Sequence, residues 1–298
     1  MSTHIEAGGR LAHPDGGDPG GPAGSPRDPR RRGGRAAQSA PSGARSRVRR
    51  WIRPARVVLA ALVILLAWNL AAPHYPGYVL PAPIDVWTSF TSTWSRGVWI
   101  EEVWATLQHL LLAFGIVLVA GLPLGIVIGR STIAEDLSRV VLVFLQTVPT
   151  IVLIALALVV AGASTSSVVG VTVAGSITYF LLNVIQGTRA IDQDLVDMAR
   201  AYRASEGAIM RTVVLPAVVP YFLAGARITL GVAWQITLFA EYLMGAEGIG
   251  FQVSSAIKLL DTKAVFMWGL SVVAMTLVLE YGAFRPAERR LTRHVKKG

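Results

Sequence analysis

The sequence contains no cysteine, which excludes disulfide bonds and thiolate metal sites. Charge is also scarce: 15% of the 298 residues are charged, against about 25% in a typical soluble domain. No Asp, Glu, Lys or Arg occurs between Glu102 and Arg130, or between Arg139 and Arg189. Each gap exceeds the ~20 residues that a helix needs to cross a bilayer. The sequence therefore predicts an all-α, polytopic membrane protein.

The apolar segments predict about six transmembrane helices. We expect them at 56–72, 104–129, 140–160, 168–188, 214–240 and 264–284. Pro149 should kink the third span, because its ring blocks a backbone hydrogen bond one turn earlier. Small polar residues at 161–167 predict the hairpin that follows it. In the second span, glycines at four-residue spacing would let another helix approach closely; they are Gly121, Gly125 and Gly129.

The basic residues predict the orientation of these spans. The formal charge is +10, and most of it flanks apolar segments, as expected for a membrane protein rather than a nucleic-acid partner. With a cytoplasmic N-terminus, the loops 130–139 and 189–212 and the C-terminal tail lie inside. The outside loops then hold few basic residues, namely Arg96, Lys258 and Lys263. Both termini are therefore expected to be cytoplasmic.

Residues 1–53 are rich in Gly, Pro and Arg and have little apolar periodicity. Such a segment cannot bury enough surface to offset its ordering entropy. We expect a disordered, basic cytoplasmic tail there and a transmembrane domain over 54–298. The alternative is a signal peptide cleaved near Ala72, but the long polar lead argues against it. Trp and Tyr residues at 73–100 indicate a segment at the headgroup level.

The segment 189–212 differs from the rest because it carries equal numbers of Arg and acidic residues. Apolar residues recur in it at helical spacing; they are Ile191, Leu195, Met198 or Ala199, and Tyr202. A short amphipathic helix with balanced charge suits insertion into a protein groove. A helix lying on anionic lipid would instead be strongly basic. The other possibility is a solvated loop stabilised by its own ion pairs.

This segment resembles the cytoplasmic coupling loop of ABC importer permeases, known as the EAA loop. The family pattern is Glu-Ala-Ala, three residues, Gly, nine residues, Ile, one residue, Leu-Pro. In this sequence it falls on Asp197, Met198, Ala199, Arg203, Val213, Leu215 and Pro216. Glycine at position 203 would permit a positive-φ turn, which arginine adopts only at a cost. We therefore expect the turn to move to Ser205, Glu206 and Gly207.

The resemblance extends along the chain. The segments 79–87, 224–228, 240–241 and 248–251 are similar to segments of nitrate, sulfonate and taurine importer permeases. The family's Trp-Phe-Gly motif at the end of the third span is missing, and residues 159–162 stand in its place.

The resemblance implies a type I ABC importer permease fold in a bacterial inner membrane. It implies a partner permease, identical or different, and two cytoplasmic ATPase subunits. A soluble extracytoplasmic binding protein would deliver a small solute, such as a sulfonate, taurine or nitrate anion. ATP would be hydrolysed on the partner, so no cofactor and no enzymatic activity are expected on this chain. The sequence contains no Gly-x-x-x-x-Gly-Lys-Ser/Thr phosphate loop.

Two sets of residues are candidates for function. By the resemblance, the ATPase-coupling set is Asp197, Met198, Ala199, Arg200, Tyr202, Arg203, Gly207, Leu215 and Pro216. Polar residues within spans usually face a cavity or another helix; the pathway candidates are Gln146, Tyr179, Asn183, Arg227 and Glu241. Arg227 would attract an anion or hold helices together, and Glu241 would anchor the Gly-rich loop that follows it.

Two alternative classes fit the sequence less well. A membrane enzyme needs a convergent Ser/His pair, paired Asp residues or a metal cluster. His109 lies within a span, but no carboxylate lies within one turn of it in the sequence. A self-contained secondary transporter normally shows inverted repeats and carboxylates at mid-membrane depth. Neither feature is present in this sequence.

Overall fold

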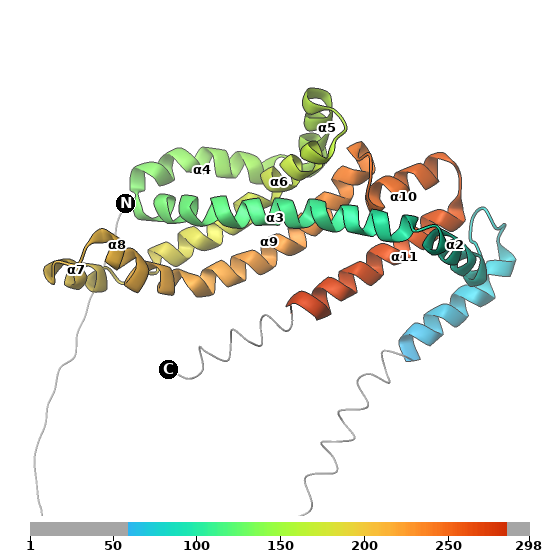
Figure 1. Ribbon diagram of the computed structural model, residues 1–298, viewed down its shortest axis with the longest axis horizontal. Coiled ribbons are helices and arrows are strands. Elements are labelled where there is room, and N and C mark those ends of the chain that lie inside the picture. The colour runs from blue at the N-terminus through green and yellow to red at the C-terminus, as the bar shows by residue number, and fades with distance from the viewer. Residues whose placement is uncertain (1–58, 285–298) are drawn as a thin grey trace, which may run out of the picture. The chain divides into compact units, whose positions relative to one another are not determined.

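The computed structural model describes residues 59–284, and no strand occurs in that range (Figure 1). The expected tail 1–53, the start of the first span and the C-terminal basic segment lie outside the described residues. The range begins with an apolar helix, Leu59–His74. The further α-helices are α2 Pro83–Ser95, α3 Val98–Arg130, α4 Thr132–Thr147, α5 Thr150–Ala161, α6 Thr165–Arg189, α7 Gln193–Ala201, α8 Glu206–Ile209, α9 Leu215–Met244, α10 Ile249–Lys258 and α11 Thr262–Val278.

Three helices are long and apolar enough to cross a membrane: Val98–Arg130, Thr165–Arg189 and Glu206–Met244. The last of these joins α8 to α9 through a π-helical turn, Met210–Val214. The expected first and sixth spans correspond to shorter apolar helices, Leu59–His74 and Thr262–Val278. Length and composition thus identify three spans, or four if the bent pair α4 and α5 forms one.

The expected third span is not one kinked helix. α4 and α5 are bent by 96° at their junction, so α5 runs across the direction of α4 in Figure 1, and its Ile154 is buried against α6 and α9. Val148 has extended backbone (φ −68°, ψ 122°) because the ring of Pro149 disfavours helical geometry in the preceding residue. Most of the expected loop 130–139 is also helical, since the Ser131 hydroxyl accepts a hydrogen bond from the Ala134 N–H and begins α4.

Close packing of α3, α6 and α9 forms the centre of the fold (Figure 1). A Cβ at Gly121, Gly125 or Gly129 would lie 2.5, 2.6 or 2.7 Å from side chains of α6. Those side chains are Phe180, Val184 and Thr188. The expected close approach of a helix to this glycine stripe is therefore confirmed, and α6 is that helix.

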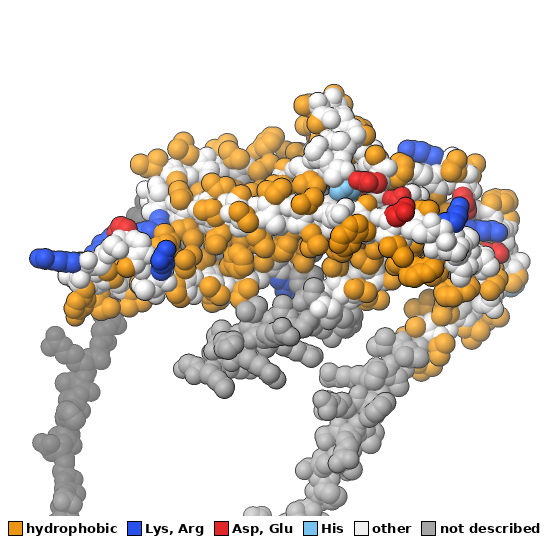
Figure 2. Space-filling model, in the orientation of Figure 1, with side chains coloured by type: hydrophobic (Ala, Val, Ile, Leu, Met, Phe, Trp, Pro, Cys, Tyr) orange, Lys and Arg blue, Asp and Glu red, His pale blue; other side chains and the backbone are white. Residues whose placement is uncertain are grey.

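α6 packs on α9 in the same way. A Cβ at Gly225 of α9 would lie 2.8 Å from Cβ of Asn183, and a Cβ at Gly187 would lie 2.7 Å from Tyr221. In Figure 1, α7 and α8 lie at one end of these helices, and α2 and α10 lie at the other. Hydrophobic side chains cover the surface between the ends, and charged side chains gather near both ends (Figure 2). Such a surface suits a helix bundle embedded in a bilayer.

Candidate functional site: the coupling loop and a buried polar network

The segment expected to dock on a partner contains a short helix, as the apolar spacing predicts. α7 spans Gln193–Ala201, and the Asp192 side chain caps it by accepting a hydrogen bond from the Asp194 N–H at 3.0 Å. After α8 and the π-helical turn, Leu215 begins α9, and Pro216 is its second residue.

Arg203 ends α7 in a left-handed conformation, with φ 59°. The Arg203 N–H donates to the Arg200 carbonyl at 2.8 Å, and the Ala204 N–H donates to the Ala199 carbonyl at 3.0 Å. These two bonds form a Schellman motif, the commonest left-handed helix end. The expectation that the turn moves to Ser205–Gly207 is wrong, because Gly207 lies within α8 and has no positive φ. The motif's hydrogen bonds offset the conformational cost to arginine.

Replacing Arg203 with glycine should stabilise the chain. Left-handed backbone costs a non-glycine residue about 1–2 kcal/mol, and glycine adopts it freely. We expect Arg203→Gly to raise the free energy of unfolding by about 1 kcal/mol. Thermal unfolding of the purified protein measures this, with Arg96→Gly as the control, because Arg96 has φ −85° and gains nothing from glycine. A lower melting temperature for Arg203→Gly would contradict this account of the helix end.

α7 has an inner face and an outer face. Ile191 and Val196 are buried, and Ala199 packs against the same hydrophobic core. Leu195, Met198 and Tyr202 are 47%, 54% and 82% exposed. The predicted apolar ridge therefore divides: Ile191 and Ala199 stabilise the fold, while the other residues form an exposed stripe at i, i+3 and i+7. We call Leu195, Met198 and Tyr202 the docking stripe.

Ion pairs connect α7 to α3 at this end of the bundle. Glu206 accepts hydrogen bonds from Arg200 Nε of α7 and Arg130 Nη2 of α3, both at 3.1 Å. Asp197 lies 3.6 Å from the Arg200 guanidinium, and its side chain is 71% exposed. Arg189 and Glu135 form a further ion pair between α6 and α4. The loop thus has ion pairs of its own, as the solvated-loop alternative requires, but it is also attached to the bundle.

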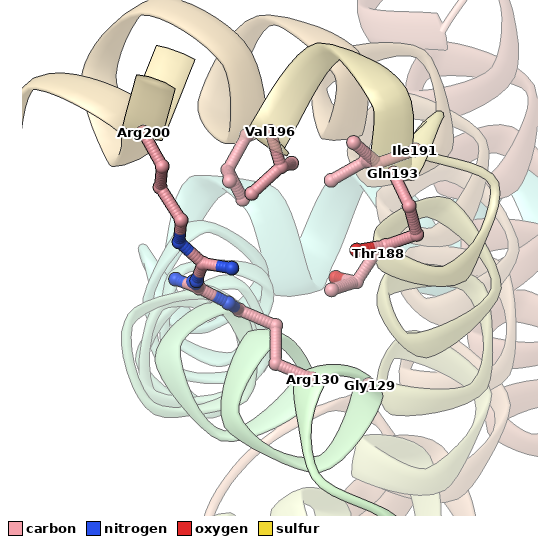
Figure 3. A pocket seen from close by; sticks show the side chains of 8 residues that line it. Gly129, Arg130, Thr188, Ile191, Gln193, Val196 and Arg200 are labelled. Carbon is pink, nitrogen blue, oxygen red and sulfur yellow. The ribbon is translucent and has the colours of Figure 1, made fainter. Parts of the chain in front are cut away.

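A cavity of about 250 Å³ lies between the ends of α3 and α6 and the inner face of α7. Arg130 and Arg200 approach each other on one side of it, and Thr188 and Gln193 lie on the other (Figure 3). Its remaining lining residues are Gly129, Ile191, Val196 and Val214. The space under α7 is therefore incompletely filled, which makes this part of the loop less tightly packed than the helix core.

The pathway candidates do not form one cluster. Gln146 is exposed near the end of α4. Tyr179 and Asn183 lie one turn apart on α6, and the Asn183 side-chain amide donates to the Tyr179 carbonyl at 2.8 Å. The Arg227 side chain is 46% exposed, and its guanidinium lies 3.9 Å from the Glu280 carboxylate.

Glu241 has a different role from the other pathway candidates, because its side chain is fully buried. It lies 2.8 Å from His109 Nδ1 and accepts hydrogen bonds from the Thr106 hydroxyl at 2.9 Å and the Gly250 N–H at 3.0 Å. The expectation that Glu241 anchors the Gly-rich loop is confirmed by the bond to Gly250. A buried carboxylate is tolerated only with such partners.

The family described as "Binding-protein-dependent transport system inner membrane component" matches residues 121–284. The chain belongs to this family. The taurine transport system permease TauC of Escherichia coli is 26% identical to it, over 82% of this chain and 92% of that protein. The nitrate import permease NrtB of Synechocystis is 28% identical, over 69% of this chain and 76% of that protein. The chain is thus a permease of binding-protein-dependent ABC importers, and its relatives include permeases named for taurine and nitrate transport.

Solved structures agree with this fold. A chain of the inward-facing MetNI methionine ABC transporter superposes with a TM-score of 0.55 at 22% identity, covering 65% of the permease and 94% of that chain. The expected all-α ABC importer permease fold is therefore confirmed.

A further sequence relative, a probable ABC transporter permease of Brucella melitensis, is 28% identical over 72% of the permease and 87% of its own length.

The sequence did not reveal two features of the permease. Arg130 and Glu206 are 76 residues apart, so their contact has no local pattern. His109 and Glu241 are 132 residues apart, which is why the sequence showed no carboxylate near the histidine. The usable signal was the presence of ionisable residues inside apolar segments, since such residues require a partner.

Proposed function

We propose that the permease docks on a cytoplasmic ATPase through the docking stripe of α7. The observation that supports this most is an exposed apolar stripe, Leu195, Met198 and Tyr202, on a short helix of balanced charge at one end of the bundle. Exposed apolar residues at i, i+3 and i+7 are the pattern of a helix that inserts into a groove. ATP would be hydrolysed on the partner, so the permease itself would need no cofactor and catalyse no reaction.

The other coupling candidates would assist in different ways. Asp197, with its exposed carboxylate beside the stripe, would contact the ATPase directly. Arg200 would hold α7 through Glu206, which also binds Arg130 of α3. A displacement of α7 by the ATPase would then move α3 as a rigid body, a common mode of switching. Arg203, Gly207, Leu215 and Pro216 would shape the loop and its exit into α9.

We infer that a second permease copy, identical or different, covers one face of α6 and α9. Polar residues on α6 recur there at helical spacing, at Tyr179, Asn183 and Gln186. Exposed polar and small residues also recur on α9; they are Arg227, Gly231 and Gln235. Polar residues are costly in lipid, and both polar and small residues usually face a partner helix or a solute pathway. The pathway would then run between the two copies, with Gln146 farther along its wall.

The solute would be a small anion or a similar small molecule delivered by an extracytoplasmic binding protein. Relatives are named for nitrate, taurine and bicarbonate transport. The half-exposed guanidinium of Arg227 would favour a negative solute. Its contact with Glu280 fits the other role, a link between helices. Both termini would be cytoplasmic, because that places the most basic loops inside.

Affinity purification of the tagged permease from its own membranes tests the proposed function. We expect an ATP-binding-cassette ATPase to co-purify and the complex to hydrolyse ATP. Recovery of the permease alone, under mild detergent and at native expression, would contradict docking. That result would favour a self-contained transporter.

A further inference from the structure

We propose that α3 acts as a connecting rod that transmits movement of the coupling loop to α10 at the opposite end of the permease. α3 spans Val98–Arg130 without a break, and its 33 residues extend about 50 Å. It has polar contacts near both ends that reach other elements. This inference rests on the proposed ATPase coupling, and it adds which residues receive the movement.

At one end, α3 is fastened to the coupling loop. Arg130 is the last residue of α3, and its guanidinium donates to Glu206 at 3.1 Å. Glu206 also accepts a hydrogen bond from Arg200 of α7 at the same distance. One carboxylate therefore joins the two helices, and a displacement of α7 reaches α3 through charged hydrogen bonds, which are the stronger kind.

Along its length, α3 packs closely on α6. The glycine stripe of α3 receives side chains of α6, and Val117 and Ile126 of α3 share a buried core with Phe180 and Val184 of α6. Close-packed interiors have low compressibility and transmit strain. The contact with α6 thus keeps α3 rigid along its length, so that a displacement at one end reaches the other.

At the other end, α3 caps α10. The N–H of Gly248 donates to Glu102 at 2.6 Å, and the N–H of Ile249 donates to the Thr106 hydroxyl at 2.8 Å. The Gln252 side-chain amide also donates to Glu102, at 2.7 Å. The first N–H groups of a helix have no acceptor within it, and here side chains of α3 accept hydrogen bonds from two of them. α10 therefore begins where α3 holds it.

Glu241 of α9 completes this cap. It binds the N–H of Gly250 and is itself held by Thr106 and His109 of α3. α10 also has left-handed backbone at both flanks, at Gly248 (φ 101°) and Leu260 (φ 56°). A helix with sharp turns at both ends and a cap provided by α3 is well placed to respond when α3 moves.

A spin label on α10 tests the rod. The permease has no cysteine, so Lys258→Cys at the end of α10 provides the single labelling site on this chain. In the complex with its ATPase, we expect ATP to change the mobility of the label. Thr106→Val removes the hydroxyl that caps α10 and should reduce this change at least about fivefold, while ATP hydrolysis continues. Glu206→Gln, at the other end of the rod, should reduce it as well.

The controls separate coupling from simple damage. Thr91→Val removes an exposed hydroxyl of α2 and should leave the label response unchanged. Thr106→Ser keeps a hydroxyl at position 106, so it should show the response that Thr106→Val loses. If ATP changes the mobility of the label equally in Thr106→Val and Thr91→Val, with hydrolysis intact, the role of α3 as a rod is wrong but ATPase docking still stands. Absence of any ATPase from the purified, unaltered permease would overturn the proposed function and the rod together.

Discussion

Met198→Lys should release the ATPase from the permease without preventing membrane insertion. Met198 is 54% exposed and lies at the centre of the docking stripe. A lysine there would place an unpaired charge within an apolar contact, which costs several kcal/mol at the centre of an interface. A loss of about 3 kcal/mol weakens binding more than 100-fold. Titration of the purified permease with its ATPase measures the change in affinity.

A charge added elsewhere provides the control for this substitution. Leu259 is 78% exposed and follows α10, at the end remote from α7. Leu259→Lys adds the same charge and should leave ATPase affinity unchanged. If both variants bind the ATPase as the unaltered permease does, the docking stripe is not the interface. If both lose it, the effect is general rather than local.

His109→Leu should destabilise the permease by about 3–5 kcal/mol, because it leaves a buried carboxylate without its histidine partner. The side chains of His109 and Glu241 are 2% and 0% exposed, so water cannot replace the lost contact. The expected result is a large fall in the melting temperature of the purified protein. The loop at 245–248 should also become more accessible to protease, because Glu241 holds it.

Two further variants identify the cause of that loss. In His109→Leu with Glu241→Gln the buried charge is gone, so this double variant should be more stable than His109→Leu alone. His74 is exposed and bonds only the carbonyl of Leu70 among the described contacts, so His74→Leu should change stability by no more than about 0.5 kcal/mol. Equal losses of stability in His109→Leu and His74→Leu would show that the buried pair contributes no more to stability than an exposed histidine does.

The sequence predicted those features that depend on local composition. The charge gaps predicted the helical membrane fold, and apolar spacing predicted the helix of the coupling loop. Glycines at four-residue spacing predicted a close helix contact, which proved to be with α6. These predictions succeed because periodicity and charge density act over one or two turns of chain.

The features that the sequence did not predict depend on competition between interactions. At Arg203, glycine preference argued against a left-handed turn, but the two hydrogen bonds of the helix end were stronger than that preference. At Pro149, a kink was expected, and the extended backbone of Val148 produced a 96° bend instead. Which face of α7 points inward depends on the core beneath it, and that core comes from distant parts of the chain.

The buried pair also has a consequence for biosynthesis. His109 is made 132 residues before Glu241, so α3 emerges from the ribosome long before its carboxylate partner. A histidine can enter lipid as a neutral imidazole, whereas an ionised glutamate is expensive there. The order in the chain thus brings the carboxylate into the membrane after the hydroxyl of Thr106 and the imidazole of His109, its two partners. Exchanging the two residues would preserve the pair in the finished protein but reverse this order of insertion.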